Sequence, residues 1–191
     1  MTDHLRELPF PRGTTFSDQG LVTMDDSMRS DLEGKLVQVE DTVHDTGEQI
    51  TLRIVKNDTG GDITVAKKCG EFSTTTDKDY GARIGTFPGN TAGAVGKPID
   101  DAYTVGGTIP DLDLFYVVEE GLCDILTEAS AANIGVGEPV AMDGAGCIEG
   151  VATGAAAGQF VIGMAQESQN EVATAVLIRV QGGIIMPPAA G

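Results

Sequence analysis

The sequence predicts a mainly β protein: a small β-barrel or β-sandwich with one or more short helical turns and an extended N-terminal arm. Short apolar runs recur along the chain, separated by turn residues roughly every eight to twelve residues. The 191 residues include 26 glycines, and aromatic residues make up only 5%. This composition favours tight turns between short strands over long helices. With 41% hydrophobic residues, the chain is typical of a globular protein with a real core.

Residues 1–33 are predicted to form the arm. Pro9 and Pro11 disfavour a helix around Phe10, and glycines interrupt the residues that follow. The apolar residues of this segment are too irregularly spaced to build a core by themselves. Two interpretations remain open: a disordered terminus, or an arm that becomes ordered on a partner or a neighbouring subunit.

Residues 34–191 are predicted to form the β-rich domain, which begins with a three-stranded antiparallel meander over residues 34–75. Ile50, Leu52 and Ile54 alternate with Thr51 and Arg53, as a half-buried strand requires. The three strands are expected at residues 35–40, 50–54 and 63–66, with turns at 44–48 and 57–61. Whether this meander joins the C-terminal core or forms a separate unit is left open.

Residues 76–110 are predicted to be a long glycine-rich loop, a feature that is usually functional or mobile. A compact β core then occupies residues 111–191. Its last strand is apolar on both faces and is therefore expected to be central. The strands are expected at residues 114–118, 121–126, 138–142, 160–165 and 173–180, with a helical turn at 128–133, a hairpin at Asp143-Gly144 and a return strand from Cys147.

The charge is strongly acidic and unevenly distributed. The formal net charge is −17, and residues 101–191 carry twelve acidic side chains but only one basic side chain, Arg179. Such a segment has almost nothing with which to bind phosphate, nucleic acid or an anionic membrane. The simplest interpretation is a solvated acidic surface that keeps the protein soluble; a sharper one is a surface that faces solvent and is held away from nucleic acid.

The cysteines and the N-terminus predict a cytoplasmic product. Cys69, Cys123 and Cys147 are widely spaced, without a CxxC motif, and are read as reduced thiols. The N-terminus has no apolar segment of the secretory kind, and no apolar run reaches the roughly 18–20 residues that span a bilayer.

The sequence offers no catalytic constellation, so no enzyme activity and no cofactor are predicted. No GxSxG elbow occurs. The glycine-rich loop fails as a phosphate loop because Pro98 follows Lys97 and Thr91 stands where the first glycine belongs. His4 and His44 lie in the arm and in a turn, which are poor positions for a preorganised base.

Asp111 and Asp113 are a weaker candidate site. On a strand their side chains would point to the same face, which makes them a candidate for holding a cation or for acting as an acid–base pair. Calcium takes six to eight oxygen ligands, and no loop here offers a full set. No metal site is predicted, and a cation at this pair is left open.

Six segments in the second half carry a family resemblance: KPIDDAYTVGG (97–107), FYVVEEGLCDIL (115–126), ANIGVGEPV (132–140), DGAG (143–146), FVIGMA (160–165) and VLIRV (176–180). Their order resembles the capsid decoration proteins of tailed bacteriophages, also called cement or head-stabilisation proteins. The resemblance covers a little under half the chain. The chain departs from the family in having roughly eighty residues before the matching region.

The resemblance implies a compact, homotrimeric β domain on the outer surface of the virion capsid, made in the host cytoplasm and bound to the major capsid protein. It implies no nucleic-acid or membrane partner. In that family an N-terminal arm often reaches onto the shell, which here would be residues 1–33. The expected contact residues are Leu5, Leu8, Pro9, Phe10, Pro11 and Phe16, although packing of Phe10 and Phe16 on their own domain is an equal alternative.

Two other functions stay open. One is another virion component, such as a head fibre, a tail protein or the shell protein itself. The other is a ligand-binding or enzyme module, because residues 129–142 also resemble a turn of the β-clip domains in sugar-acid enzymes. Such domains bind anionic substrates through basic residues, and this half has only Arg179, whose simpler role is a salt bridge with one of the many carboxylates.

Overall fold

The computed structural model describes residue 15 and residues 32–64, 67–73, 81–89, 96–104, 107–128, 133–142, 145–151 and 161–181. This part of the chain contains twelve strands and no helix, so the prediction of a mainly β fold is confirmed. The predicted helical turn falls largely on residues outside the described ones. The strands are β1 (Leu36–Glu40), β2 (Gln49–Asn57), β3 (Ile63–Thr64), β4 (Lys68–Phe72), β5 (Arg83–Thr86), β6 (Gly96–Ile99), β7 (Thr108–Ile109), β8 (Leu114–Leu126), β9 (Pro139–Met142), β10 (Ile148–Gly150), β11 (Val161–Ala165) and β12 (Ala175–Val180).

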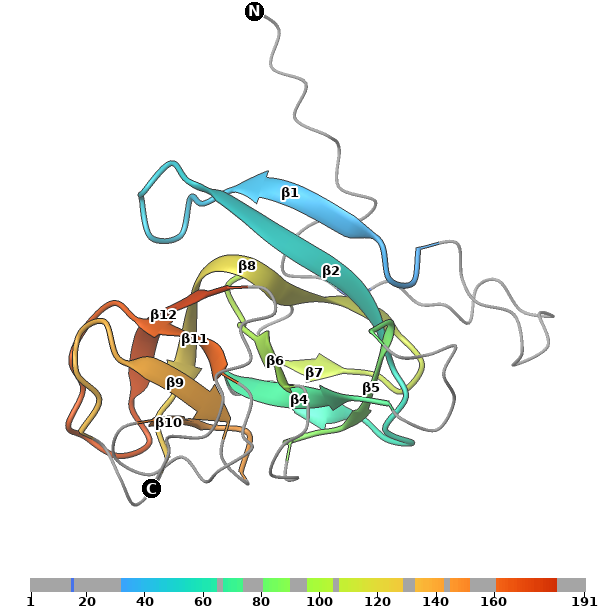
Figure 1. The fold of residues 1–191 in the computed structure, drawn as a ribbon. Coiled ribbons are helices and arrows are strands. Elements are labelled where there is room, and N and C mark those ends of the chain that lie inside the picture. The colour runs from blue at the N-terminus through green and yellow to red at the C-terminus, as the bar shows by residue number, and fades with distance from the viewer. Residues whose placement is uncertain are drawn as a thin grey trace, which may run out of the picture.

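Ten of these strands form one large sheet, and β3 and β7 form a separate pair (Figure 1). The order in the large sheet is β10-β9-β11-β12-β8-β2-β5-β4-β6, with β1 attached to β2. The neighbours are antiparallel except for β2 and β5. A single bridge, Thr127 to Ile148, brings the β10 edge toward the end of β8, but the sheet is not closed into a barrel.

Strand β8 joins the two halves of the molecule. Its first part pairs with β2, and its second part, from Gly121 onward, pairs with β12. Gly121 has a φ of +115°, and the register with β2 shifts at Thr51 and Leu52. Two strands were predicted here, at 114–118 and 121–126; they are one thirteen-residue strand with an irregularity at its middle. Strands β1, β2, β4, β5 and β6 of the first hundred residues therefore share one sheet with strands of the C-terminal core.

The core explains why the FYVV run is apolar at every position. Tyr116 and Val118 belong to the larger buried cluster, which also includes residues of β9, β11 and β12. Phe115 and Val117 point to the opposite face and belong to a second cluster with Ile63 of β3 and other residues. Both faces of this part of β8 are thus buried, as continuous apolar strands require.

Two predictions about the first half need correction. β1 and β2 do form an antiparallel pair, but β3 pairs with β7 rather than extending a meander. The reason is that β8 and β5 flank β2 where the third strand was expected. The predicted long loop over residues 76–110 contains three short strands, β5, β6 and β7. The central position of the last strand is confirmed, because β12 lies between β11 and β8.

Candidate functional site

The six arm residues predicted to contact a shell, Leu5, Leu8, Pro9, Phe10, Pro11 and Phe16, lie outside the described residues. Within the first 31 residues only Thr15 is described, and its Oγ1 donates a 2.9 Å hydrogen bond to Asp113 Oδ2. The root of the arm, residues 32–35, is described in full. Because this segment connects the predicted arm to β1, we treat it as the candidate site.

Backbone hydrogen bonds attach this root to β2. Gly34 N–H donates to the carbonyl of Ile54 at 2.7 Å, and Ile54 N–H donates to the carbonyl of Lys35 at 2.9 Å. Gly34 has a φ of +79°, a conformation that glycine adopts without a steric penalty. Leu32 packs against the larger buried cluster. The chain thus enters β1 through a turn that is held by backbone hydrogen bonds to β2 and by the packing of Leu32 against the core.

A buried ion pair fixes the same root to β5. Arg83 Nε lies 3.1 Å from Glu33 Oε2, and the two side chains are 11% and 0% exposed. Arg83 Nη1 also lies 3.9 Å from Asp58 Oδ1. Charges this far from water are tolerated only when they are paired and hydrogen-bonded. The position of Glu33 is therefore set by a strand fifty residues further along the chain.

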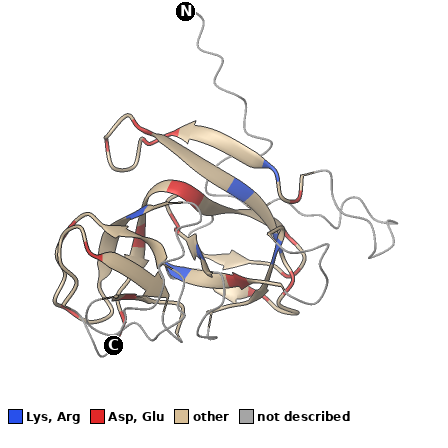
Figure 2. Ribbon diagram, in the orientation of Figure 1, with Lys and Arg blue, Asp and Glu red and all other residues tan. Residues whose placement is uncertain are grey.

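A second charged network lies beside the root and ties β2 to β8. Arg53 Nε donates to Glu119 Oε2 at 3.0 Å, and Lys97 Nζ donates to Glu119 Oε1 at 3.0 Å. Arg53 Nη1 donates to the carbonyl of Gly81 at 3.2 Å. Burial alone would raise the pKa of Glu119, but the bond from Arg53 and the charge of Lys97 outweigh it and lower the pKa. Figure 2 shows basic positions on β2 beside the acidic segment of β8.

At the other end of β1, Asp41 organises the loop that leads to β2. Its buried carboxylate accepts hydrogen bonds from the backbone N–H groups of Val43 and His44, both at 3.0 Å, and from Thr46 Oγ1 at 2.9 Å. Burial tends to raise the pKa of Asp41, yet these donors lower it below its ordinary value. His44 Nδ1 lies 3.2 Å from the same carboxylate, and its ring packs near Tyr103. This arrangement stabilises the turn between β1 and β2.

The buried carboxyl of Asp100 lies next to this loop and gives a pH-dependent prediction. Burial raises its pKa from 3.8 to about 6, although the N–H groups of Ala102 and Asp124 donate to it. A folded-state pKa above the unfolded value adds stability below about pH 4, and this contribution is lost as the pH rises through about 6. The lost stability is roughly 3 kcal/mol at most, since one pKa unit corresponds to about 1.4 kcal/mol.

The measurement is urea unfolding of the wild type and the Asp100→Asn variant at intervals from pH 4 to 7. The wild type should lose stability relative to the variant over this window, because only the wild type titrates at this position. Parallel pH profiles for the two proteins would contradict the prediction.

Asp111 and Asp113 do not form the predicted pair on a strand. Both precede β8 and lie in a turn, and Leu112 between them has a φ of +66°, which breaks the strand alternation that the prediction assumed. Asp111 N–H donates to Asp62 Oδ1 at 3.1 Å, while Asp113 accepts from Thr15. Across the described residues, no group of three or more His, Cys, Asp or Glu side chains is placed to hold a metal ion.

Arg179 forms the salt bridge that its sequence context suggested. Its Nη1 lies 2.7 Å from Glu48 Oε2, so it connects β12 to the loop after β1. Both side chains are partly exposed, at 34% and 45%. The three cysteines are buried and form no disulfide bond. The described part of the chain holds no helix long and apolar enough to cross a membrane.

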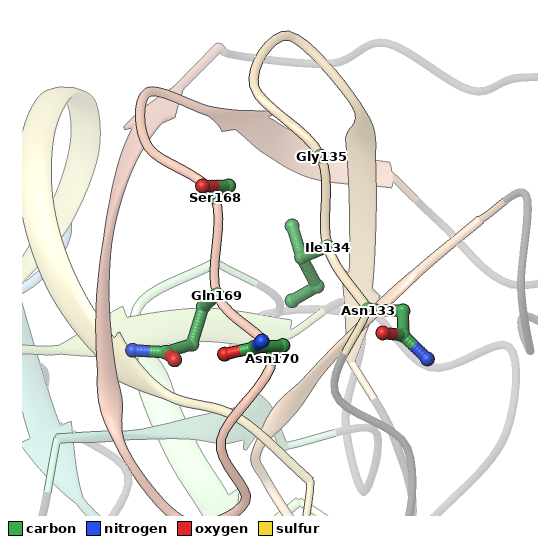
Figure 3. Close-up of a pocket in the computed structure, with 6 residues that line it drawn as sticks. All are labelled: Asn133, Ile134, Gly135, Ser168, Gln169 and Asn170. Atoms are coloured by element: carbon green, nitrogen blue, oxygen red, sulfur yellow. The ribbon is translucent and has the colours of Figure 1, made fainter.

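A shallow depression of about 300 Å³ lies between two loops of the C-terminal half (Figure 3). Ile134 and Gln169 form an isolated antiparallel bridge across it. Figure 3 shows Ile134 directed toward the segment that carries Gln169 and Asn170. None of the six lining residues is charged. The lining residues are Asn133, Ile134, Gly135, Ser168, Gln169 and Asn170.

Comparisons with known proteins do not assign the chain to a family. No protein-family model matches it, and no curated protein matches it. Among solved structures, the N base of the head fibre protein gp8.5 of bacteriophage phi29 is similar, with a TM-score of 0.38 and 15% sequence identity over 68% of this chain and 92% of that chain. At this identity and TM-score the likeness carries no argument about function.

Proposed function

We propose that this chain is a structural virion protein without enzyme activity, a decoration protein that binds the outside of an icosahedral phage head. The observation that carries the proposal is the anchored root of the arm. A buried ion pair and two backbone hydrogen bonds hold residues 33–35 against β5 and β2. An arm that binds a shell can brace it only if the arm is fixed at its own end, and this root provides such a fixed end.

The distribution of the family resemblance supports the same proposal. Its longer segments coincide with β6, β8, β9, β11 and β12. Residues of β8, β9, β11 and β12 pack into the larger buried cluster, and Ile99 of β6 packs with Phe115 and Val117 of β8 in the second cluster. Residues before the resemblance contribute β1 and β2, and β2 pairs with β8. The N-terminal extension thus enlarges the resembling domain through a shared strand. We propose a homotrimer that contacts the major capsid protein, with no nucleic acid or membrane as partner, in keeping with the net charge of −17.

Deletion of residues 1–20 tests the proposal. The truncated protein is expected to keep its fold, because the root and all described strands remain, and to lose binding to shells that lack the protein, measured by co-sedimentation. Since several modest arm contacts act together, the loss should be at least about 100-fold in apparent affinity. The matched control is Val136→Ala with Val172→Ala, which removes exposed apolar side chains outside the arm and should bind normally. Undiminished binding of the truncated protein would refute the role of the arm.

Copy number separates decoration from the other virion roles. Quantitative mass spectrometry of purified particles should give a ratio near one copy per shell subunit for a decoration protein. A few copies per particle would indicate a head fibre or tail component. Absence from the particle would contradict a virion role altogether.

A further inference from the structure

Strand β1 lies at the outer margin of the molecule (Figure 1) and, within the described part of the chain, pairs with β2 alone. The pairing fixes which of its backbone groups are free. Asp41 N–H donates to the carbonyl of Glu48 at 2.7 Å, and residues of an antiparallel ladder alternate between bonded and non-bonded positions. Val37 and Val39 therefore bond to β2. Leu36, Gln38 and Glu40 direct their N–H and C=O groups away from it.

The side chains of this edge also favour a partner. Leu36 is 50% exposed, one of four large hydrophobic residues with such exposure among those described. Edge strands that avoid pairing usually carry proline, lysine or a bulge. β1 has none of these: its sequence is LVQVE, it pairs with β2 without a register shift, and its one charged residue is Glu40. An extended edge of this kind is a template for another strand.

The charge pattern of β1 selects a second copy of itself as the occupant, in one register. If Gln38 lies opposite Gln38 of the second copy, Leu36 faces Glu40, and Val37 faces Val39. No like charges then oppose each other. Moving the axis to Val39 would place Glu40 opposite Gln38 and would leave Leu36 and Val37 opposite Thr42 and Asp41, which lie beyond the end of β1. Moving it to Glu40 would place that carboxylate opposite its own copy, which is destabilising. A shift the other way would leave Val39 and Glu40 opposite residues that precede β1.

We propose that two copies of this chain pair through their β1 edges, antiparallel, about a twofold axis at Gln38. The hydrogen-bonded pairs are Gln38 with Gln38 and Leu36 with Glu40, and Val37 meets Val39 at the closer, non-bonded positions. The contact continues the large sheet from one copy into the next. A twofold contact uses the edge of each copy once and so closes on itself. It does not depend on capsid attachment, and it adds to any threefold contact.

Two substitutions at Leu36 test the contact and its register by sedimentation equilibrium. Leu36→Lys places a cation opposite Glu40 of the second copy and should tighten association, while Leu36→Glu opposes two carboxylates and should weaken it. The interface contains this pair twice, so the two dissociation constants should differ by roughly tenfold or more, and less in 1 M salt. Position 36 is exposed, so both variants should fold like the wild type, as circular dichroism can verify.

Gln38→Pro provides an independent test, with Gln38→Thr as its control. Proline removes only the outward N–H at this position and should abolish the association, while the bonds of Val37 and Val39 to β2 remain. Threonine keeps the N–H and should associate like the wild type. The proposal would be overturned if the wild-type protein did not associate through this edge at about 100 μM. It would also be overturned if all four variants associated equally. If Leu36→Lys and Leu36→Glu changed the association equally while Gln38→Pro abolished it, a strand other than β1 would occupy the edge. This outcome also overturns the proposal.

Discussion

Replacing Arg83 with methionine is expected to lower the free energy of unfolding by about 3–5 kcal/mol, the usual cost of removing one partner of a buried ion pair. The carboxylate of Glu33 would remain at a position where its side chain is 0% exposed. Urea unfolding at neutral pH measures the effect. Arg83→Met should also release the root of the arm, so amide hydrogen exchange of Gly34 and Ile54 should accelerate.

The double variant Glu33→Leu with Arg83→Met distinguishes the cost of leaving a buried charge from the cost of replacing the two side chains. A buried ion pair replaced by apolar residues of similar size often costs little, so this protein should regain most of the lost stability. A cost below about 1 kcal/mol for Arg83→Met alone would show that water reaches Glu33 and would remove the basis for a fixed root.

Replacing Gly121 with alanine is the second large effect, with an expected loss of about 2–6 kcal/mol. Backbone strain at its φ of +115° contributes about 1–3 kcal/mol. Overpacking adds about 1–3 kcal/mol, because the new Cβ would lie 2.5 Å from Ile50 Cδ1 and 3.2 Å from Ile50 Cα. Thermal or urea unfolding measures the loss.

Gly61→Ala is the matched control for this substitution. An added Cβ at Gly61 meets no atom within 4 Å, and its φ is not positive. Its effect should stay within about 0.5 kcal/mol. Equal behaviour of the two variants would mean that the middle of β8 relaxes freely around residue 121.

The local pattern of the sequence was enough to predict most strands, and it was insufficient where pairing is non-local. The apolar run of β12 correctly indicated a central strand, since both its flanks are covered. The Glu-Glu-Gly sequence in the middle of β8 resembled a turn, but Gly121 accommodates an irregularity there and the strand continues. Nothing near Ile63 in the sequence shows that β7 is its partner rather than β2.

The candidate site was harder to predict for the same reason. Glu33 and Arg83 are fifty residues apart, and neither belongs to a recognisable motif. A single acidic residue before Gly34 gave no signal, because its significance arises only when β5 lies parallel to the end of β2. For Asp111 and Asp113 the sequence suggested a carboxylate pair that the structure does not form. Side chains two residues apart share a face only on extended backbone, and Leu112 between them has a left-handed conformation. The shell contacts of residues 5–16 stay a prediction.

The shared strand β8 also determines when this protein can fold during its synthesis. β2 ends at Asn57, whereas the strand that it pairs with most extensively begins at Leu114. A growing chain can form the β1–β2 hairpin early, but that hairpin has no cover until more than sixty further residues have left the ribosome. Pairings over such distances in sequence form slowly. The nascent chain must therefore carry the unpaired apolar residues of β2 while about a third of the protein is synthesised.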